Sequence, residues 1–208
     1  MLALLAYRLW PTWEGASAQE KFARLIESHG AYAKALLTSL AHPGSVQPEA
    51  LRGLQATARR TRGDAEAASA RLADEPAGNR MRPELAQVLT ATVSRLAHAE
   101  LALHAFALSP GGQPPAKAIA RIDHFASALD LAMSRIANAL RTSRPEEVAP
   151  LRPIYTALAA ELPRDAPLAA LADRLVDATN TLATAVRWYQ CVVHARRSSL
   201  ATVKRSKG

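Results

Sequence analysis

The sequence predicts an all-α fold, an antiparallel bundle of about five or six helices whose short loops contain Pro and Gly. Apolar residues recur at intervals of three and four along most of the chain, which is the period of an amphipathic helix. Interruptions of this pattern coincide with Pro and Gly, as in residues 42–44 and 110–112. The sequence has no β-branched runs, Asn-Gly hairpins or regular strand spacing. Helices joined by such short loops pack as antiparallel neighbours.

The first two helices can be placed by their end signals. Ser17, with Glu20 three residues later, forms a capping-box pattern that predicts a helix ending near residue 42. Pro48 suits the first turn of a second helix, which runs to Pro76. Because apolar residues are sparse in this second helix, we expect it to lie on the outside of the bundle or to pack very closely.

Four further helices follow. Pro83 opens a third helix, Pro115 precedes a fourth, a short helix covers residues 153–161, and a last long helix starts near Pro167. The fourth and last helices keep a heptad spacing, which favours the shallow crossing angle of four-helix bundles. The predicted apolar seam of the last helix consists of Leu168, Leu171, Leu175, Ala178, Leu182, Ala185, Tyr189 and Val192.

The composition bounds the class of protein. At 208 residues and 49% hydrophobic content, the chain suits one domain with a sizeable core. Only 5% of residues are aromatic, so Ala and Leu fill that core and the helices must pack closely. The single cysteine, Cys191, cannot form an internal disulfide and is compatible with the reducing cytoplasm. Cys191 and His194 have a metal-ligand spacing, but no second pair completes a zinc site.

Much of the net charge of +8 lies near the end of the sequence. Five Lys and Arg residues and no acid follow residue 195, which predicts a flexible, solvated tail over residues 196–208. Next to a bilayer this tail would be attracted to anionic lipid. It contains no aromatic residue that could stack on a base, so the sequence does not favour nucleic acid as a partner.

The first fourteen residues combine an apolar run with residues typical of a membrane interface. This membrane-junction motif comprises Tyr7, Arg8, Trp10, Pro11, Trp13 and Glu14. Trp, Tyr and Arg gather where a hydrophobic segment leaves a bilayer. The apolar part is too short to span, which takes about 20 residues. It can be read as the last turns of a membrane helix or as a short strand or core helix of a soluble domain.

Three stretches resemble the fusaric-acid-resistance type of transporter, also called the aromatic acid exporter or FUSC family. Residues 6–14, AYRLWPTWE, are similar to the segment that leaves the last membrane helix of these proteins. Residues 58–67 and 71–76 resemble an Arg-rich helix of the family that ends in Glu-Pro, although Gly63 and Asp64 depart from its usual residues. Residues 96–105, LAHAELALHA, resemble a third family helix. The resemblance covers most of residues 1–110 and weakens afterwards.

The resemblance implies a bacterial inner-membrane efflux transporter that exports aromatic carboxylic acids or similar toxic compounds. Residues 1–14 would then end a transmembrane helix, residues 15–195 would form a cytoplasmic helical domain, and residues 196–208 would be its basic tail. The implied partners are the transmembrane part of the same polypeptide, further copies in a homo-oligomer, and a periplasmic adaptor with an outer-membrane channel. The implied role of the domain is assembly of protomers or gating of the cytoplasmic entrance.

Two groups of charged residues are candidate sites. Arg59, Arg60 and Arg62 form a basic cluster that is either a solvated face with local ion pairs or a docking face for anionic lipid or a partner domain. Glu100 and His104 lie one turn apart at the edge of an apolar stripe. A half-buried pair of this kind can titrate near neutral pH, or it can simply satisfy itself.

Other carboxylates and the known catalytic motifs give no reason to propose an enzyme. Asp173 and Asp177 share a helical face, as do Asp123 and Asp130, but both pairs lie opposite the apolar seams and look solvated. There is no phosphate-binding Gly loop, nucleophile elbow or zinc-protease motif. We expect neither a catalytic residue nor a metal or cofactor. The alternative function is a free-standing helical adaptor that binds protein or nucleic acid through its basic tail.

Overall fold

The computed structural model describes residues 11–73, 81–109 and 113–205, and the side chains of residues 11–16, 73 and 192–205 lie outside that description. The described residues form six α-helices and one 3₁₀ helix without strands, which confirms the predicted all-α bundle. The elements are α2 (Pro11–Ala41), α3 (Pro48–Ala73), α4 (Pro83–Ala107), η1 (Ala116–Ala118), α5 (Ile119–Thr142), α6 (Arg152–Ala159) and α7 (Pro167–Arg205).

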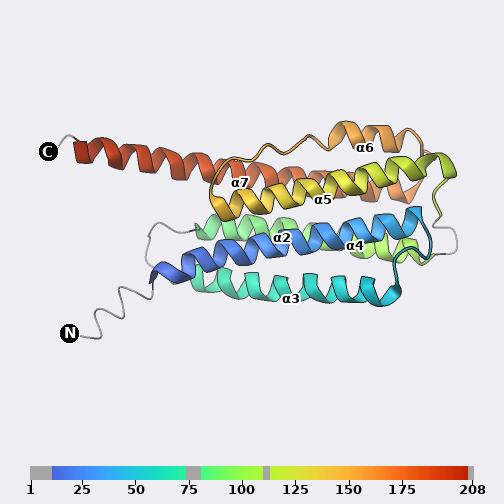
Figure 1. Cartoon of the computed structure of the whole chain (residues 1–208), viewed down its shortest axis with the longest axis horizontal. Coiled ribbons are helices and arrows are strands. Elements are labelled where there is room, and N and C mark those ends of the chain that lie inside the picture. The colour runs from blue at the N-terminus through green and yellow to red at the C-terminus, as the bar shows by residue number, and fades with distance from the viewer. Residues whose placement is uncertain (1–10, 74–80, 110–112, 206–208) are drawn as a thin grey trace.

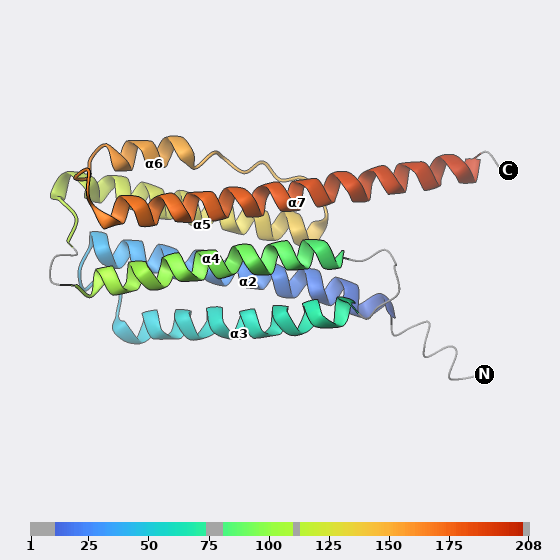
Figure 2. The ribbon, with the colours of Figure 1, turned by 180° about the vertical axis from the view of Figure 1, so that it is seen from behind.

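Four of these helices enclose the core. The helices α2, α4, α5 and α7 pack around it. Among these four, the most extensive contacts are in the pairs α2/α5 and α4/α7. The helix α3 lies outside against α2 and α4, while α6 lies outside against α5 and α7 (Figures 1 and 2). The position of α3 matches the expectation from its sparse apolar residues. The segment between α5 and α6 returns along the bundle, so α5 and α7 run in the same direction (Figure 1).

The predicted seams fill the interior. On α5, all six seam residues are buried: Ile122, Ala126, Leu129, Met133, Ile136 and Leu140. On α7, Leu168, Leu171, Leu175, Ala178, Leu182 and Tyr189 are buried, whereas Ala185 is half-buried. Burial of this apolar surface is the main stabilising contribution to the fold.

Gly30 sets the separation of α2 and α5. A Cβ atom added at Gly30 would lie 2.8 Å from Met133 Cβ and 3.3 Å from Met133 Cγ. No side chain larger than hydrogen fits without movement of one helix. This close approach places α2 deep in the bundle, between α5 on one side and α3 and α4 on the other.

Polar contacts fix the end of α5. The helix ends at Thr142 and is followed by the C-cap residue Ser143, whose φ of 53° is left-handed, as is common at helix C-termini. The buried Gln190 side chain on α7 donates hydrogen bonds to the carbonyl oxygens of Ala139, at 2.9 Å, and Arg144, at 2.8 Å. Gln190 therefore ties α7 to the last turn of α5 and to the segment that follows it.

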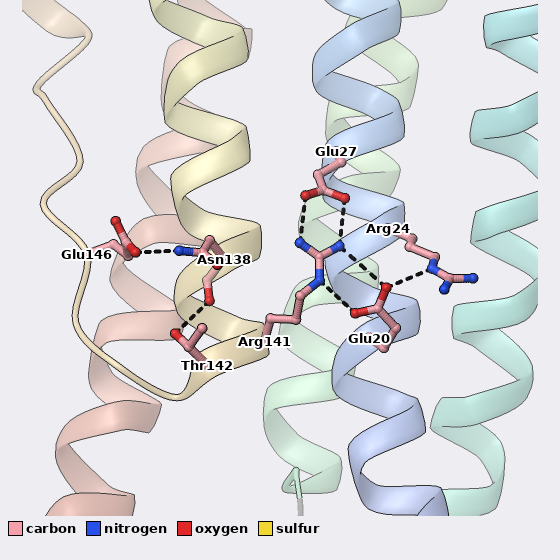
Figure 3. A network of polar contacts seen from close by, with 7 residues as sticks. All are labelled: Glu20, Arg24, Glu27, Asn138, Arg141, Thr142 and Glu146. Carbon is pink, nitrogen blue, oxygen red and sulfur yellow. Dashed lines mark hydrogen bonds and ion pairs between the residues drawn. The ribbon is translucent and has the colours of Figure 1, made fainter.

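An Arg-centred network joins the same end of α5 to α2 (Figure 3). The Arg141 guanidinium donates two 2.7 Å hydrogen bonds to the two carboxylate oxygens of Glu27, and its Nε donates a 2.6 Å bond to Glu20. Glu20 also accepts a 2.7 Å bond from Arg24, one turn away on α2. On α5, Asn138 donates a 2.5 Å bond to Glu146 in the segment that returns along the bundle. Arg141 thus pairs with two glutamates, one of them in a bidentate geometry. This is the most extensive ion-pair group of the described residues.

Two predicted boundaries differ from the structure. Ser17 lies inside α2, which is already helical from Pro11, so the predicted N-cap at Ser17 is wrong. No break in the helix separates residues 1–14 from residues 15–195 in the part that is described. The helix α7 continues to Arg205, so residues 196–205, expected as flexible tail, are helical. In both cases a continuous helix extends past a local sequence signal.

The two ends of the described chain lie at the same end of the bundle. The start of α2 and the last turns of α7 point the same way, and α7 extends beyond its neighbours (Figures 1 and 2). In the part of the chain that the structure describes, none of the helices is sufficiently long and apolar to cross a bilayer.

Candidate functional site

A buried His–Glu pair connects α2 to α4. His29 Nδ1 lies 2.7 Å from Glu100 Oε2, and the two residues are only 3% and 2% exposed. His29 belongs to the apolar seam of α2, and Glu100 follows Leu96 by one turn on the inner face of α4. The remaining polar side-chain atoms, His29 Nε2 and Glu100 Oε1, have no hydrogen-bond partner among the described residues. This pair is the main polar group inside the apolar core.

Burial controls the protonation of this pair. It raises the pKa of Glu100, because the ionised carboxylate is poorly solvated in the core. The hydrogen bond and the positive charge of His29 act in the opposite direction on the pKa of Glu100, with smaller effect. Glu100 therefore makes the stability of the α2–α4 packing depend on pH. Neither His29 nor Glu100 lines the hollows between α4 and α7 that are described below.

A second polar pair lies one turn further along both helices. The Tyr32 hydroxyl and His104 Nδ1 are 2.7 Å apart, and the two rings meet edge to face. Burial is the main cause that raises the pKa of Tyr32 to about 12, and the charge of Glu100 adds to it. The sequence predicted Glu100 and His104 as a pair one turn apart. Instead each contacts a residue on α2, Glu100 with His29 and His104 with Tyr32.

The basic cluster lies on the outer helix α3. Arg59 and Arg60 are exposed, and Arg60 donates a 3.1 Å hydrogen bond to Thr57 on the same helix. Arg62 is partly buried and donates bonds to Glu66, at 2.8 Å, and to Ser94 on α4, at 3.0 Å. Arg62 thus helps to attach α3 to α4, which leaves Arg59 and Arg60 as the exposed part of the predicted docking face.

The membrane-junction motif is only partly inside the described chain. Tyr7, Arg8 and Trp10 lie outside the described residues. Pro11, Trp13 and Glu14 are in the first turn of α2, and their side chains lie outside the description. The role proposed for this motif stays a prediction.

The four aspartates named in the sequence analysis contact basic side chains at the surface. Asp173 and Asp177 both contact the Arg152 guanidinium of α6. Asp130 accepts a 2.9 Å hydrogen bond from Lys34, and Asp123 lies 2.9 Å from His42 Nε2. These carboxylates join neighbouring helices at the surface and show no paired acid–base arrangement.

A groove between α4 and α7 was not predicted from the sequence. The α4/α7 groove has a volume of about 830 Å³ and is lined by Glu84, Leu85, Val88, Arg95, Asp177, Asn180, Thr181, Thr184, Ala185 and Trp188. A smaller hollow of about 370 Å³ adjoins it through Arg95, Asp177 and Thr181. Val88 and Trp188 stand outside the seams of their helices, at 44% and 54% exposure. An apolar residue outside the seam of its helix is the sequence signal from which this groove could have been predicted.

Metal ligands do not converge in the described part of the chain. No group of three or more His, Cys, Asp or Glu side chains there is arranged to hold a metal ion. Cys191 is a free, exposed thiol, and the His194 side chain lies outside the described residues. The α4/α7 groove and the buried polar pairs are therefore the features from which a function can be argued.

Comparisons with known proteins gave no relative. No protein-family model, curated protein or solved structure matches the chain.

Proposed function

We propose that this chain is a cytoplasmic helical domain of a bacterial inner-membrane efflux transporter of the fusaric-acid-resistance type. The exported compounds would be aromatic carboxylic acids or similar toxic molecules, and the domain would act in assembly of protomers or in gating. The observation that carries the proposal is the resemblance of residues 6–14, together with the stretches at 58–76 and 96–105. The first of these has the interfacial Trp, Tyr and Arg content expected where a chain leaves a bilayer.

The arrangement of the two ends supports this proposal. The start of α2, which follows the membrane-junction motif, lies at the same end of the bundle as the last turns of α7 (Figure 1). The sequence of these last turns contains Arg196, Arg197, Lys204 and Arg205 and no acid. A bilayer adjoining the start of α2 would therefore also be close to this basic segment, where each Lys or Arg contributes about 1 kcal/mol of attraction to anionic lipid.

Size and membrane partition in the source cells test the proposal. An antibody raised against the bundle would be used on fractionated cells. We expect a band several times heavier than the 208-residue chain that stays in the membrane through salt and carbonate washes. A soluble band of the size of the 208-residue chain would contradict the proposal. The helical adaptor would then be the working model, and its nucleic-acid binding should fall steeply with salt and require residues 196–208.

A vesicle assay tests the role of the basic end separately. The 208-residue chain would be sedimented with vesicles of phosphatidylglycerol and phosphatidylcholine. We expect the replacement of Arg196, Arg197, Lys204 and Arg205 by Ser to reduce the bound fraction several-fold. The matched control replaces four Arg residues on other surfaces, Arg52, Arg59, Arg60 and Arg121. If only the control set reduces binding, the lipid-facing surface includes α3 or α5 and not the end of α7.

A further inference from the structure

The α4/α7 groove is hollow and is not covered by an outer helix, in contrast to two other grooves between core helices. The helix α3 covers α2/α4, and α6 covers α5/α7 (Figure 2). The α2/α5 groove is closed by ion pairs, among them Lys34 with Asp130 and Arg141 with Glu27. The α4/α7 groove has instead two exposed apolar side chains and the volume of a small-molecule site.

One end of this groove is apolar and aromatic. It is lined by Leu85 and Val88 from α4 and by Ala185 and Trp188 from α7. Trp188 is 54% exposed although Tyr189, its neighbour in sequence, is buried. An exposed indole over a concave apolar surface offers a flat face for a planar ligand. Glu84 also lines this end, so the apolar end does not attract an anionic group.

The other end is cationic. Arg95 lines both the groove and the adjoining hollow, in which Arg174 and His98 also lie. Neither Arg95 nor Arg174 forms an ion pair with any described residue, and Arg95 has only a 3.3 Å hydrogen bond to Thr92. Asp177, which also lies here, is in contact with Arg152. An uncompensated guanidinium at the end of an apolar groove is suited to bidentate binding of a carboxylate.

The spacing of the two ends indicates the size of a ligand. Val88 and Arg95 are seven residues apart on α4, so they share one face and are separated by about 10 Å along the axis. Thr181 and Trp188 repeat this spacing on α7. A body of two fused rings with one acid group covers that distance.

We propose that the α4/α7 groove binds a small organic anion with a flat apolar body, its acid group against Arg95 and its rings against Trp188. The guanidinium of Arg95, which has no ion-pair partner among the described residues, argues for this occupant over a purely apolar helix, which would bury Arg95 without a partner. The inference deepens the proposed function and rests on it for the role of the ligand, because such an anion belongs to the aromatic acids named there. The groove itself lies in the bundle whether or not the chain belongs to a transporter, so ligand binding and membrane partition can fail separately.

Calorimetric titration of the 208-residue chain tests the proposal with two probes of similar shape. We expect 2-naphthoate to bind saturably with one site per chain, and the neutral 2-naphthylmethanol to bind at least tenfold more weakly. Arg95→Gln should weaken naphthoate binding at least tenfold, which is the effect of losing a charged hydrogen bond. Trp188→Leu should weaken the binding of both probes. Arg121→Gln, which removes an exposed Arg outside the groove, should leave both affinities unchanged.

Three results would overturn the proposal. They are naphthoate binding that does not saturate, naphthoate binding no tighter than that of the neutral probe, and naphthoate binding by Arg95→Gln as tight as by wild type. Light scattering supplies a fourth readout. If the chain is a dimer that Val88→Glu dissociates, while Leu131→Glu on α5 does not, a second copy occupies the groove and no ligand site is present. Circular dichroism confirms that each variant is folded, and neither outcome bears on the fractionation of source cells.

Discussion

Glu100 is held in the core by a single hydrogen-bond partner, His29, whose Nδ1 atom lies 2.7 Å from the Glu100 carboxyl. The two residues join α2 to α4, and each retains one buried polar atom without a partner in the described structure. A pair satisfied at only one contact is costly to bury and sensitive to any change in its protonation.

The first prediction concerns pH. Because the pKa of Glu100 is raised on folding, the folded protein holds this proton more tightly than the unfolded chain. Its contribution to stability is full below the ordinary pKa of 4.5 and is lost as pH rises. The free energy of unfolding of wild type should therefore fall relative to Glu100→Gln as the pH rises from 4.5 towards neutral. Urea denaturation followed by circular dichroism measures both.

Glu20 supplies a control of opposite sign. Its hydrogen bond from Arg141 is the main cause that lowers the pKa of Glu20, so the stability it contributes is present above 4.5 and lost as the pH falls. Wild type should lose stability relative to Glu20→Gln as the pH falls below 4.5, whereas its difference from Glu100→Gln should change above 4.5. Changes of both differences in the same pH range would show that the pH response does not arise at these carboxyls.

The second prediction concerns the pairing of His29 and Glu100. His29→Leu leaves a buried carboxyl without its partner and should reduce the free energy of unfolding by about 3 kcal/mol. The double change His29→Leu with Glu100→Met removes both polar groups and fills the space with apolar side chains. It should be clearly more stable than His29→Leu alone. Equal stabilities of the single and double variants would mean that the two residues are not coupled.

The third prediction concerns the close approach at Gly30. Gly30→Ala would place a methyl group 2.8 Å from Met133 Cβ, and the required shift should cost about 1–3 kcal/mol. Gly63 lies inside α3, where an added Cβ has no neighbour within 4 Å. Gly63→Ala should therefore stabilise the protein by about 0.5–1 kcal/mol, because Ala is the better helix former. Thermal unfolding should give shifts of opposite sign, and a shared sign would argue against the α2–α5 geometry.

The sequence was informative about local structure for particular physical reasons. Heptad apolar residues on α5 and α7 are buried because each helix has one continuous contact face. Pro48, Pro83 and Pro167 begin their helices because Pro fits the first turn, where its missing N–H is not needed. The predicted helix start at Ser17 is wrong because the helix already runs from Pro11, so the capping pattern at Ser17 lies inside it.

The candidate site was harder to predict, because its contacts join distant residues. His29 and Glu100 are 71 residues apart, and the sequence offered His104, one turn away, as the nearer partner for Glu100. A helical repeat gives the face on which a residue lies, but it does not say which helix that face meets. For the same reason the sequence did not place Val88 and Arg95 of α4 along one groove with Trp188 of α7, and the α4/α7 groove became visible only in the folded chain.

The fourth prediction concerns the network around Arg141. Its side chain is 32% exposed and contacts two glutamates of α2, so Arg141→Met should cost about 1 kcal/mol after allowance for solvent screening. Arg52→Met removes an exposed Arg that pairs with Glu49 on its own helix, and it should change stability by no more than about 0.5 kcal/mol. Chemical denaturation in low and high salt measures both. An Arg141→Met effect as small as that of Arg52→Met would mean that the bidentate contact does not hold α5 to α2.

The last prediction concerns the capping of α5 by α7. Gln190→Leu keeps the volume but removes the donor for the carbonyl oxygens of Ala139 and Arg144. Because Gln190 is buried, both carbonyl oxygens lose a donor that water cannot easily replace, and the change should cost about 1–2 kcal/mol. Gln190→Glu should cost more, since a carboxylate would face these carbonyl oxygens.

The matched control is Gln87→Leu, which alters an exposed Gln on α4 and should leave stability within about 0.5 kcal/mol of wild type. Hydrogen exchange of the amides near residue 142 should accelerate in the Gln190 variants alone, because α5 then frays from its C-terminal end. Unchanged exchange there, with the same loss of global stability, would place the effect of Gln190 in core packing instead of in the cap.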